Sequence, residues 1–132
     1  MVEGSTPKKL GLVFQAAAVK KPLLSVHRVV ERGNKVCFGP GEKDNYIECP
    51  RTGDKFFMTK SGSGSYILKV DFLGGGRGEI TVDSGAEENV CPAGWAPQFQ
   101  VKSPNRKMNF RGANGSEITH YGQKEVECTC PF

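Results

Sequence analysis

Short apolar runs separated by glycine-containing turns make up most of the chain, and this pattern restricts the fold to one built from many short strands. The 132 residues include 17 glycines and 8 prolines, which punctuate runs of β-branched and aromatic residues. Only 26–32 has helical spacing, with Ser25 as N-cap and Gly33-Asn34 as stop signal. The length fits one domain. We therefore expect a single all-β domain over 1–132 with one short helix.

The turn signals divide the chain into a series of expected strands. A meander of four strands follows the helix, and Asn114-Gly115 is a strong hairpin signal near the end of the chain. Trp95 is expected to be a core or interface plug, and the charged helix residues are expected to lie largely in solvent. The glycine-rich 74–78 is predicted to be a flexible linker between a first part, 1–73, and a second part, 79–132. The strands are expected at 10–18, 35–38, 46–49, 55–59, 66–72, 80–82, 107–111, 118–122 and 125–130.

One expected strand carries a carboxylate into a tight turn. Ile80 and Val82 alternate with Thr81, and Asp83 follows at once, before Ser84 and Gly85. Gly85 permits a sharp bend, and Ser84 can donate a hydrogen bond beside the acid. An aspartic protease needs such an acid, because two carboxylates about 3 Å apart share a proton and activate a water. A plain Asx-type turn between two strands would have the same residues, so both interpretations stay open on these residues alone.

Charge and cysteine usage exclude several classes of function. The net charge of +4 comes from basic residues spread among acidic ones, which argues against nucleic-acid binding. No apolar run reaches membrane-spanning length, and the start of the chain lacks a signal-peptide core. We expect a cytoplasmic, non-secreted protein with reduced thiols, no cofactor and no metal. A zinc site from Cys128, Cys130 and His120 is the metal alternative, although no CxxC pair occurs among Cys37, Cys49, Cys91, Cys128 and Cys130.

Three segments resemble the retropepsin-like aspartic proteases. Residues 80–90, ITVDSGAEENV, resemble the active-site segment of that family, and 107–118, KMNFRGANGSEI, resemble its flap, with the tip at Gly112-Ala113-Asn114-Gly115. Residues 22–26 resemble the hydrophobic pair that enters the family's helix. The stretch 23–70 is similar to segments that follow the protease core in Copia-like retroelement polyproteins.

The order of these segments differs from the family's order. Family members run acid turn, flap, paired strands, hydrophobic pair and helix, whereas here the helix half precedes the acid-turn half. The resemblance therefore implies a closed or partly open retropepsin-like β-barrel in circularly permuted order, with the usual ends joined by the glycine linker. It predicts that the strand near Val126 pairs antiparallel with the strand near Val13, and that the chain ends lie close together.

The resemblance also implies an activity. Only one Asp-Ser-Gly or Asp-Thr-Gly occurs, so a protease requires a homodimer in which Asp83 of each chain meets the other on a two-fold axis. One Asp83 would activate the lytic water while the other polarises the scissile carbonyl of an extended peptide. Such an endopeptidase would process a polyprotein in the cytoplasm or inside a retroelement particle. Ser84 and Gly85 would brace the carboxylates, and the substrate cleft would be formed by Ala86, Glu87, Glu88, Leu23 and Leu24 under the hairpin Gly112, Ala113, Asn114 and Gly115.

Two other classes of function stay open. The chain could be a folded but catalytically inactive binding or assembly module, including an engineered permuted scaffold. A small nucleic-acid-binding β-barrel is the third interpretation. It depends on basic residues near Phe110, namely Lys102, Arg106, Lys107 and Arg111.

Overall fold

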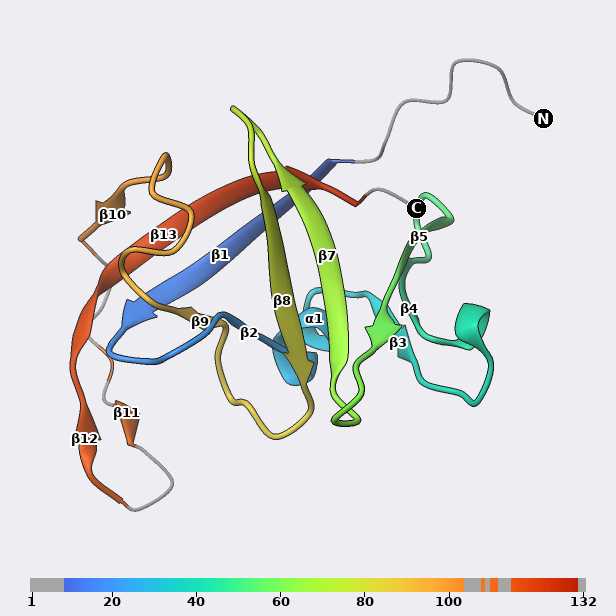
Figure 1. Cartoon of the computed structure of the whole chain (residues 1–132), viewed down its shortest axis with the longest axis horizontal. Coiled ribbons are helices and arrows are strands. Elements are labelled where there is room, and N and C mark those ends of the chain that lie inside the picture. The colour runs from blue at the N-terminus through green and yellow to red at the C-terminus, as the bar shows by residue number, and fades with distance from the viewer. Residues whose placement is uncertain (1–8, 104–107, 109, 112–114, 131–132) are drawn as a thin grey trace.

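A computed structural model describes residues 9–103, 108, 110–111 and 115–130, and within them the chain is mostly β (Figure 1). The expected β-rich fold with one short α-helix is confirmed. None of the helices in these residues has the length and apolar character needed to cross a bilayer. The elements are β1 (Lys9–Ala17), β2 (Leu23–Ser25), α1 (Val26–Glu31), β3 (Lys35–Cys37), the 3₁₀ helix η1 (Glu42–Asp44), β4 (Tyr46–Cys49), β5 (Asp54–Phe57), β6 (Thr59–Lys60), β7 (Tyr66–Phe72), β8 (Arg77–Asp83), β9 (Val90–Cys91), β10 (Val101–Lys102), β11 (Phe110–Arg111), β12 (Glu117–Ile118) and β13 (His120–Thr129).

Eight strands form one mixed sheet in the order β10-β13-β1-β9-β2-β8-β7-β6. β13 also pairs with β7, through Cys128 opposite Phe72 and Thr129 opposite Asp71, so the sheet curls back on itself. This closure buries the face that the alternating residues of the strands share. The retropepsin-like form of the barrel stays a prediction.

The long strands β1 and β13 lie side by side and antiparallel (Figure 1). Leu12 is opposite Val126 and Val13 is opposite Glu125, which confirms the predicted pairing of these two segments. Lys9 is opposite Thr129, so the two described ends of the chain are neighbours. Permuted ancestry stays a prediction, because two such strands can also pair in an unrelated β-fold.

Alternating apolar residues on the central strands build the core. Leu68 and Ile80 are fully buried on β7 and β8, and Val126 is buried on β13 between exposed glutamates. On β1 the alternation is lost, because Phe14 to Ala17 are buried on both faces of the strand. Trp95 is partly buried and packs edge-on against Phe14 of the core, with ring centroids 5.1 Å apart, so the structure places it at the edge of the core.

Lys124 is a polar exception within this core. Its side chain is 1% exposed, although it lies on an apolar strand face of β13. The ammonium group donates to the backbone carbonyls of Ala93, at 2.9 Å, Trp95 and Ala96. Burial lowers the pKa of Lys124 below its usual value. The lysine thereby holds the loop that carries Trp95 against the sheet.

The predicted four-strand meander is wrong, because its strands divide between two sheets. β3, β4 and β5 form a separate three-stranded sheet, whereas β6 pairs with β7 in the large sheet. The predicted strand 55–59 breaks at Met58, whose side chain is buried and whose N–H donates to the carbonyl of Asn45 at 2.8 Å. This turn of the backbone passes the chain from one sheet to the other.

The predicted flexible linker is also wrong, because most of it is a hairpin turn. The N–H of Phe72 donates to the carbonyl of Gly76 at 2.9 Å, and Gly75 donates back to Phe72 at 3.0 Å. Gly74, Gly75 and Gly76 all have positive φ, which only glycine adopts readily. Arg77 and Gly78 already belong to β8.

Other boundaries shift by small amounts. α1 ends at Glu31, one residue earlier than expected, with Ser25 as the predicted N-cap. The predicted strands 118–122 and 125–130 are instead the short β12 and one continuous strand, β13. Of the predicted strand 107–111, residues 107 and 109 lie outside the described residues, and β11 is the part that is seen.

Candidate functional site

The acid turn follows directly from the alternation on β8. Ile80 and Val82 point into the core, so the next residue, Asp83, emerges half-buried at the end of the strand. Ser84 and Gly85 form an exposed turn. The N–H of Gly85 donates to Oδ1 of Asp83 at 2.8 Å, which orients the carboxylate with respect to its own turn.

Parallel pairing with β2 places Ser25 next to Asp83 in register. Ser25 is fully buried, and its hydroxyl has two partners. Its Oγ accepts from the N–H of Arg28 at 3.2 Å as the helix N-cap, and donates to the carbonyl of Ala86 at 2.7 Å. One hydroxyl thus connects the start of α1 to the loop after Asp83, residues 84–89, which we call the acid loop.

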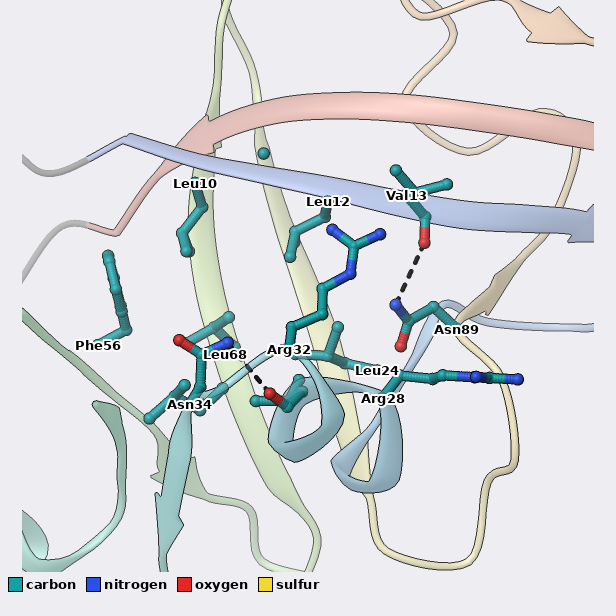
Figure 2. A pocket seen from close by; sticks show the side chains of 13 residues that line it. Leu10, Leu12, Val13, Leu24, Arg28, Arg32, Asn34, Phe56, Leu68 and Asn89 are labelled. Atoms are coloured by element: carbon teal, nitrogen blue, oxygen red, sulfur yellow. Dashed lines mark hydrogen bonds between the residues drawn. The ribbon is translucent and has the colours of Figure 1, made fainter. Parts of the chain in front are cut away.

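Asn89 anchors the other end of the acid loop. Its side-chain Oδ1 accepts from the N–H of Ser25 at 2.7 Å, and its Nδ2 donates to the carbonyl of Val13 at 3.2 Å (Figure 2). Its own carbonyl accepts from the N–H of Gln15 at 2.8 Å. Asn89 therefore joins β1, β2 and the acid loop. Sequence reasoning missed it, since a polar residue before a strand gives no signal of such contacts.

An ion-pair network lies beside this anchor. Arg28 donates to Glu88 of the acid loop and to Glu31 at 2.7 Å. These hydrogen bonds raise the pKa of Arg28, and the bond from Arg28 lowers the pKa of Glu31. The expectation that Arg28 lies largely in solvent is therefore wrong, because it is half-buried against the acid loop.

Some of the predicted site residues lie together in the structure, and others do not. Asp83, Ser84 and Gly85 lie together in the turn, with Ala86 half-buried and Glu87 exposed beside them. Glu88 is engaged by Arg28, and Leu23 is half-buried on β2. Leu24 is 1% exposed and belongs to the core. Gly112, Ala113 and Asn114 lie outside the described residues, and Gly115 is exposed.

The residues of the possible zinc site are not brought together. Cys128 lies opposite Leu10 at one end of the β1–β13 pair, whereas His120 lies opposite Ala17 at the other. His120 Nδ1 accepts from the N–H of Met108 at 3.2 Å, and Nε2 lies 2.9 Å from Oε1 of Gln15. In the part of the chain that the structure describes, no group of three His, Cys, Asp or Glu side chains is placed to hold a metal ion.

The chemistry that this arrangement can perform depends on Asp83. Among the described residues, its carboxylate has one hydrogen-bond donor, the amide of Gly85. Its other oxygen, Oδ2, has no hydrogen-bond donor in the part of the chain that the structure describes. No family model, curated protein or solved structure matches this chain, so the geometry of the acid turn and its anchors is what bears on function.

Proposed function

We propose that the chain is one half of an aspartic endopeptidase that cleaves extended peptides as a homodimer. The observation that carries the proposal is the geometry of Asp83, which ends a buried strand, lies in a Ser-Gly turn and is half-exposed. In the dimer, Asp83 of each chain would meet its copy. The pair would share one proton, since two carboxylates in contact do not both ionise.

The anchors behind the acid loop support this role. Catalysis by a carboxylate pair requires each acid to be held within a fraction of an ångström. Ser25, Asn89 and Arg28 hold the loop from behind with buried or charge-assisted hydrogen bonds. Leu23 lies opposite Thr81, two residues before the Ser25–Asp83 pair, and would offer an apolar wall to a peptide side chain.

The pairing of β1 with β13 supports the permuted order on which the resemblance depends. In the family's order these strands are neighbours in one hairpin, and here they pair in register while belonging to opposite ends of the chain. New chain ends created by cutting the connection between these two strands would leave the sheet intact.

A peptide-cleavage assay at about pH 5, where a shared-proton acid pair is active, tests the proposal. The wild type should cleave an unstructured polypeptide, and Asp83→Asn should lose the activity by a factor of about a thousand or more because the acid pair acts as a unit. Asp44→Asn, which changes an exposed acid in η1, is the matched control and should keep activity. Cleavage that persists in Asp83→Asn would contradict the proposal, and a folded, inactive wild type would favour a binding or assembly module.

A further inference from the structure

A pocket of about 90 Å³ lies between α1, β1 and the three-stranded sheet of β3, β4 and β5, which we call the small sheet (Figure 2). Asp83 is not part of the lining of this pocket. We call it the helix pocket. Its interior is made of apolar side chains from six elements, so residues distant in sequence meet there. These are Leu10 and Leu12 of β1, Leu24 of β2, Val29 of α1, Ile47 and Phe56 of the small sheet, and Leu68 of β7.

The interior favours a small apolar group over water. Leu24 and Leu68 are almost fully buried, and Figure 2 shows Leu10 and Leu12 reaching down from β1 above them. A water molecule occupies about 30 Å³ in the liquid, and the apolar side chains of the interior offer it no hydrogen-bond partner. The polar residues of the lining are Arg28, Arg32, Asn34 and Asn89. A cavity of 150 Å³ accommodates benzene, so the helix pocket suits a smaller group, such as a branched alkyl chain of about four carbons.

Two arginines lie at the edge of this apolar interior. Arg32 contributes to the lining, and its side chain extends from the end of α1 toward Leu12 and Val13 (Figure 2). Within the described residues its guanidinium has no hydrogen bond or ion pair, and the carboxylate of the neighbouring Glu31 is bound by Arg28.

Arg28 leaves a second donor without a partner. Its two terminal nitrogens bind Glu31 and Glu88, whereas its buried Nε has no hydrogen-bond acceptor among the described residues. An unpaired buried N–H is costly, but the Arg28 side chain extends past Asn89 and away from the leucines of the pocket interior, so Arg32 is the arginine that faces a ligand there (Figure 2). A guanidinium binds a carboxylate with two parallel hydrogen bonds.

We propose that the helix pocket binds a short branched alkyl carboxylate, with the alkyl group in the apolar interior and the carboxylate on Arg32. The ligand could be a free acid or the C-terminal leucine-like residue of a peptide, since both present the same two groups. The proposal does not depend on the activity of Asp83, which lies outside the pocket.

Titration of the ¹⁵N-labelled full chain with 4-methylpentanoate, followed by amide NMR shifts, tests the proposal. The amides of Val13, Val29 and Asn34, which line the pocket, should shift and saturate. The neutral 4-methylpentanamide, which lacks the carboxylate, and acetate, which lacks the branched chain, should each bind at least about tenfold more weakly. An acetylated tripeptide ending in leucine, compared with its C-terminal amide, distinguishes the two sources of the ligand.

Two variants and a control complete the test. Arg32→Gln should weaken binding of 4-methylpentanoate about tenfold and abolish the preference over the amide. Leu12→Phe should fill the pocket and remove binding, with folding checked by circular dichroism. Arg51→Gln, which removes an exposed arginine outside the pocket, should bind as the wild type does. Equal binding of acid and amide, unchanged binding in Arg32→Gln, or no shift of the pocket amides would each overturn the proposal.

Discussion

Raising the pH should destabilise the folded chain through the three buried thiols. Cys91, Cys128 and Cys130 are 0%, 2% and 8% exposed. Burial raises the pKa of Cys91 and Cys128 to about 11 and that of Cys130 to about 12, from an ordinary value of 9.0. Because the folded pKa values lie above the unfolded ones, this stability is complete well below pH 9.0, at about pH 8 and lower. It is lost as the pH rises toward the folded values.

The size of the effect follows from linkage. At about pH 10 an unfolded thiol is about nine-tenths ionised, whereas a folded thiol with a pKa of about 11 stays mostly protonated. This difference lowers the free energy of unfolding by about 1.4 kcal/mol for each thiol. Three such thiols together lower the free energy of unfolding by about 4 kcal/mol. Lys124 acts in the opposite direction, because desolvation lowers its folded pKa and its contribution to stability rises with pH. Since the free energy of unfolding of a single domain is about 5–15 kcal/mol, a loss of this size should be readily measured.

Urea unfolding at a series of pH values under reducing conditions measures this loss. The free energy of unfolding should be flat up to about pH 8 and then fall by several kcal/mol by about pH 10. Cys128→Ala should reduce the alkaline loss by about a third, whereas Cys37→Ala, which removes a half-exposed thiol, should retain it. A wild-type stability that stays constant over this range would refute the burial of these thiols.

Three further substitutions test the packing around the site. Asn89→Ala leaves the N–H of Ser25 without its acceptor and should lower the free energy of unfolding by about 2–4 kcal/mol; a loss below about 0.5 kcal/mol in urea unfolding would contradict this anchor. Lys124→Met removes a buried ammonium group from three carbonyls and should cost about 2–4 kcal/mol, with proteolysis of the loop at 93–96 as the local readout. Gly122→Ala places a Cβ against the carbonyl of Lys102 at a φ of +156° and should cost about 2 kcal/mol or more in thermal unfolding; an unchanged melting temperature would exclude this close approach.

Local patterns predict the elements of this chain better than they predict its contacts. The strand ending in Asp83 and the N-cap at Ser25 depend on neighbouring residues, and the structure contains both. The strong hairpin signal at Asn114-Gly115 lies partly outside the described residues. The split of the meander at Met58 depends on a distant carbonyl, that of Asn45, so alternation alone did not reveal it. The glycine run at 74–76 reads as a linker in composition, whereas its role as a hairpin turn depends on the pairing of β7 with β8.

The candidate site shows the same division. The acid turn is local, and its position could be predicted from Ile80, Val82 and Asp83. Its anchors are not local, because the contacts from Ser25 to Ala86 and from Arg28 to Glu88 each join residues about 60 positions apart. These contacts arise from the parallel register of β2 with β8, and no residue pattern in either segment encodes that register. Only the tertiary arrangement brings these groups together.

The contrast between a firmly held loop and an incompletely partnered acid predicts how activity depends on concentration. Asn89 and Ser25 tie the acid loop to β1, β2 and α1, yet within the described residues the Asp83 carboxylate accepts a hydrogen bond from the amide of Gly85 alone. No other aspartate precedes Ser-Gly or Thr-Gly, so in the proposed endopeptidase the second acid would come from a second chain. At protein concentrations below the dissociation constant of the dimer, the cleavage rate should therefore fall with the square of the protein concentration. Mixing the wild type with an excess of Asp83→Asn should inhibit cleavage, because mixed dimers form. A rate that stays proportional to concentration throughout, with sedimentation showing a monomer, would refute the two-chain site even if cleavage were real.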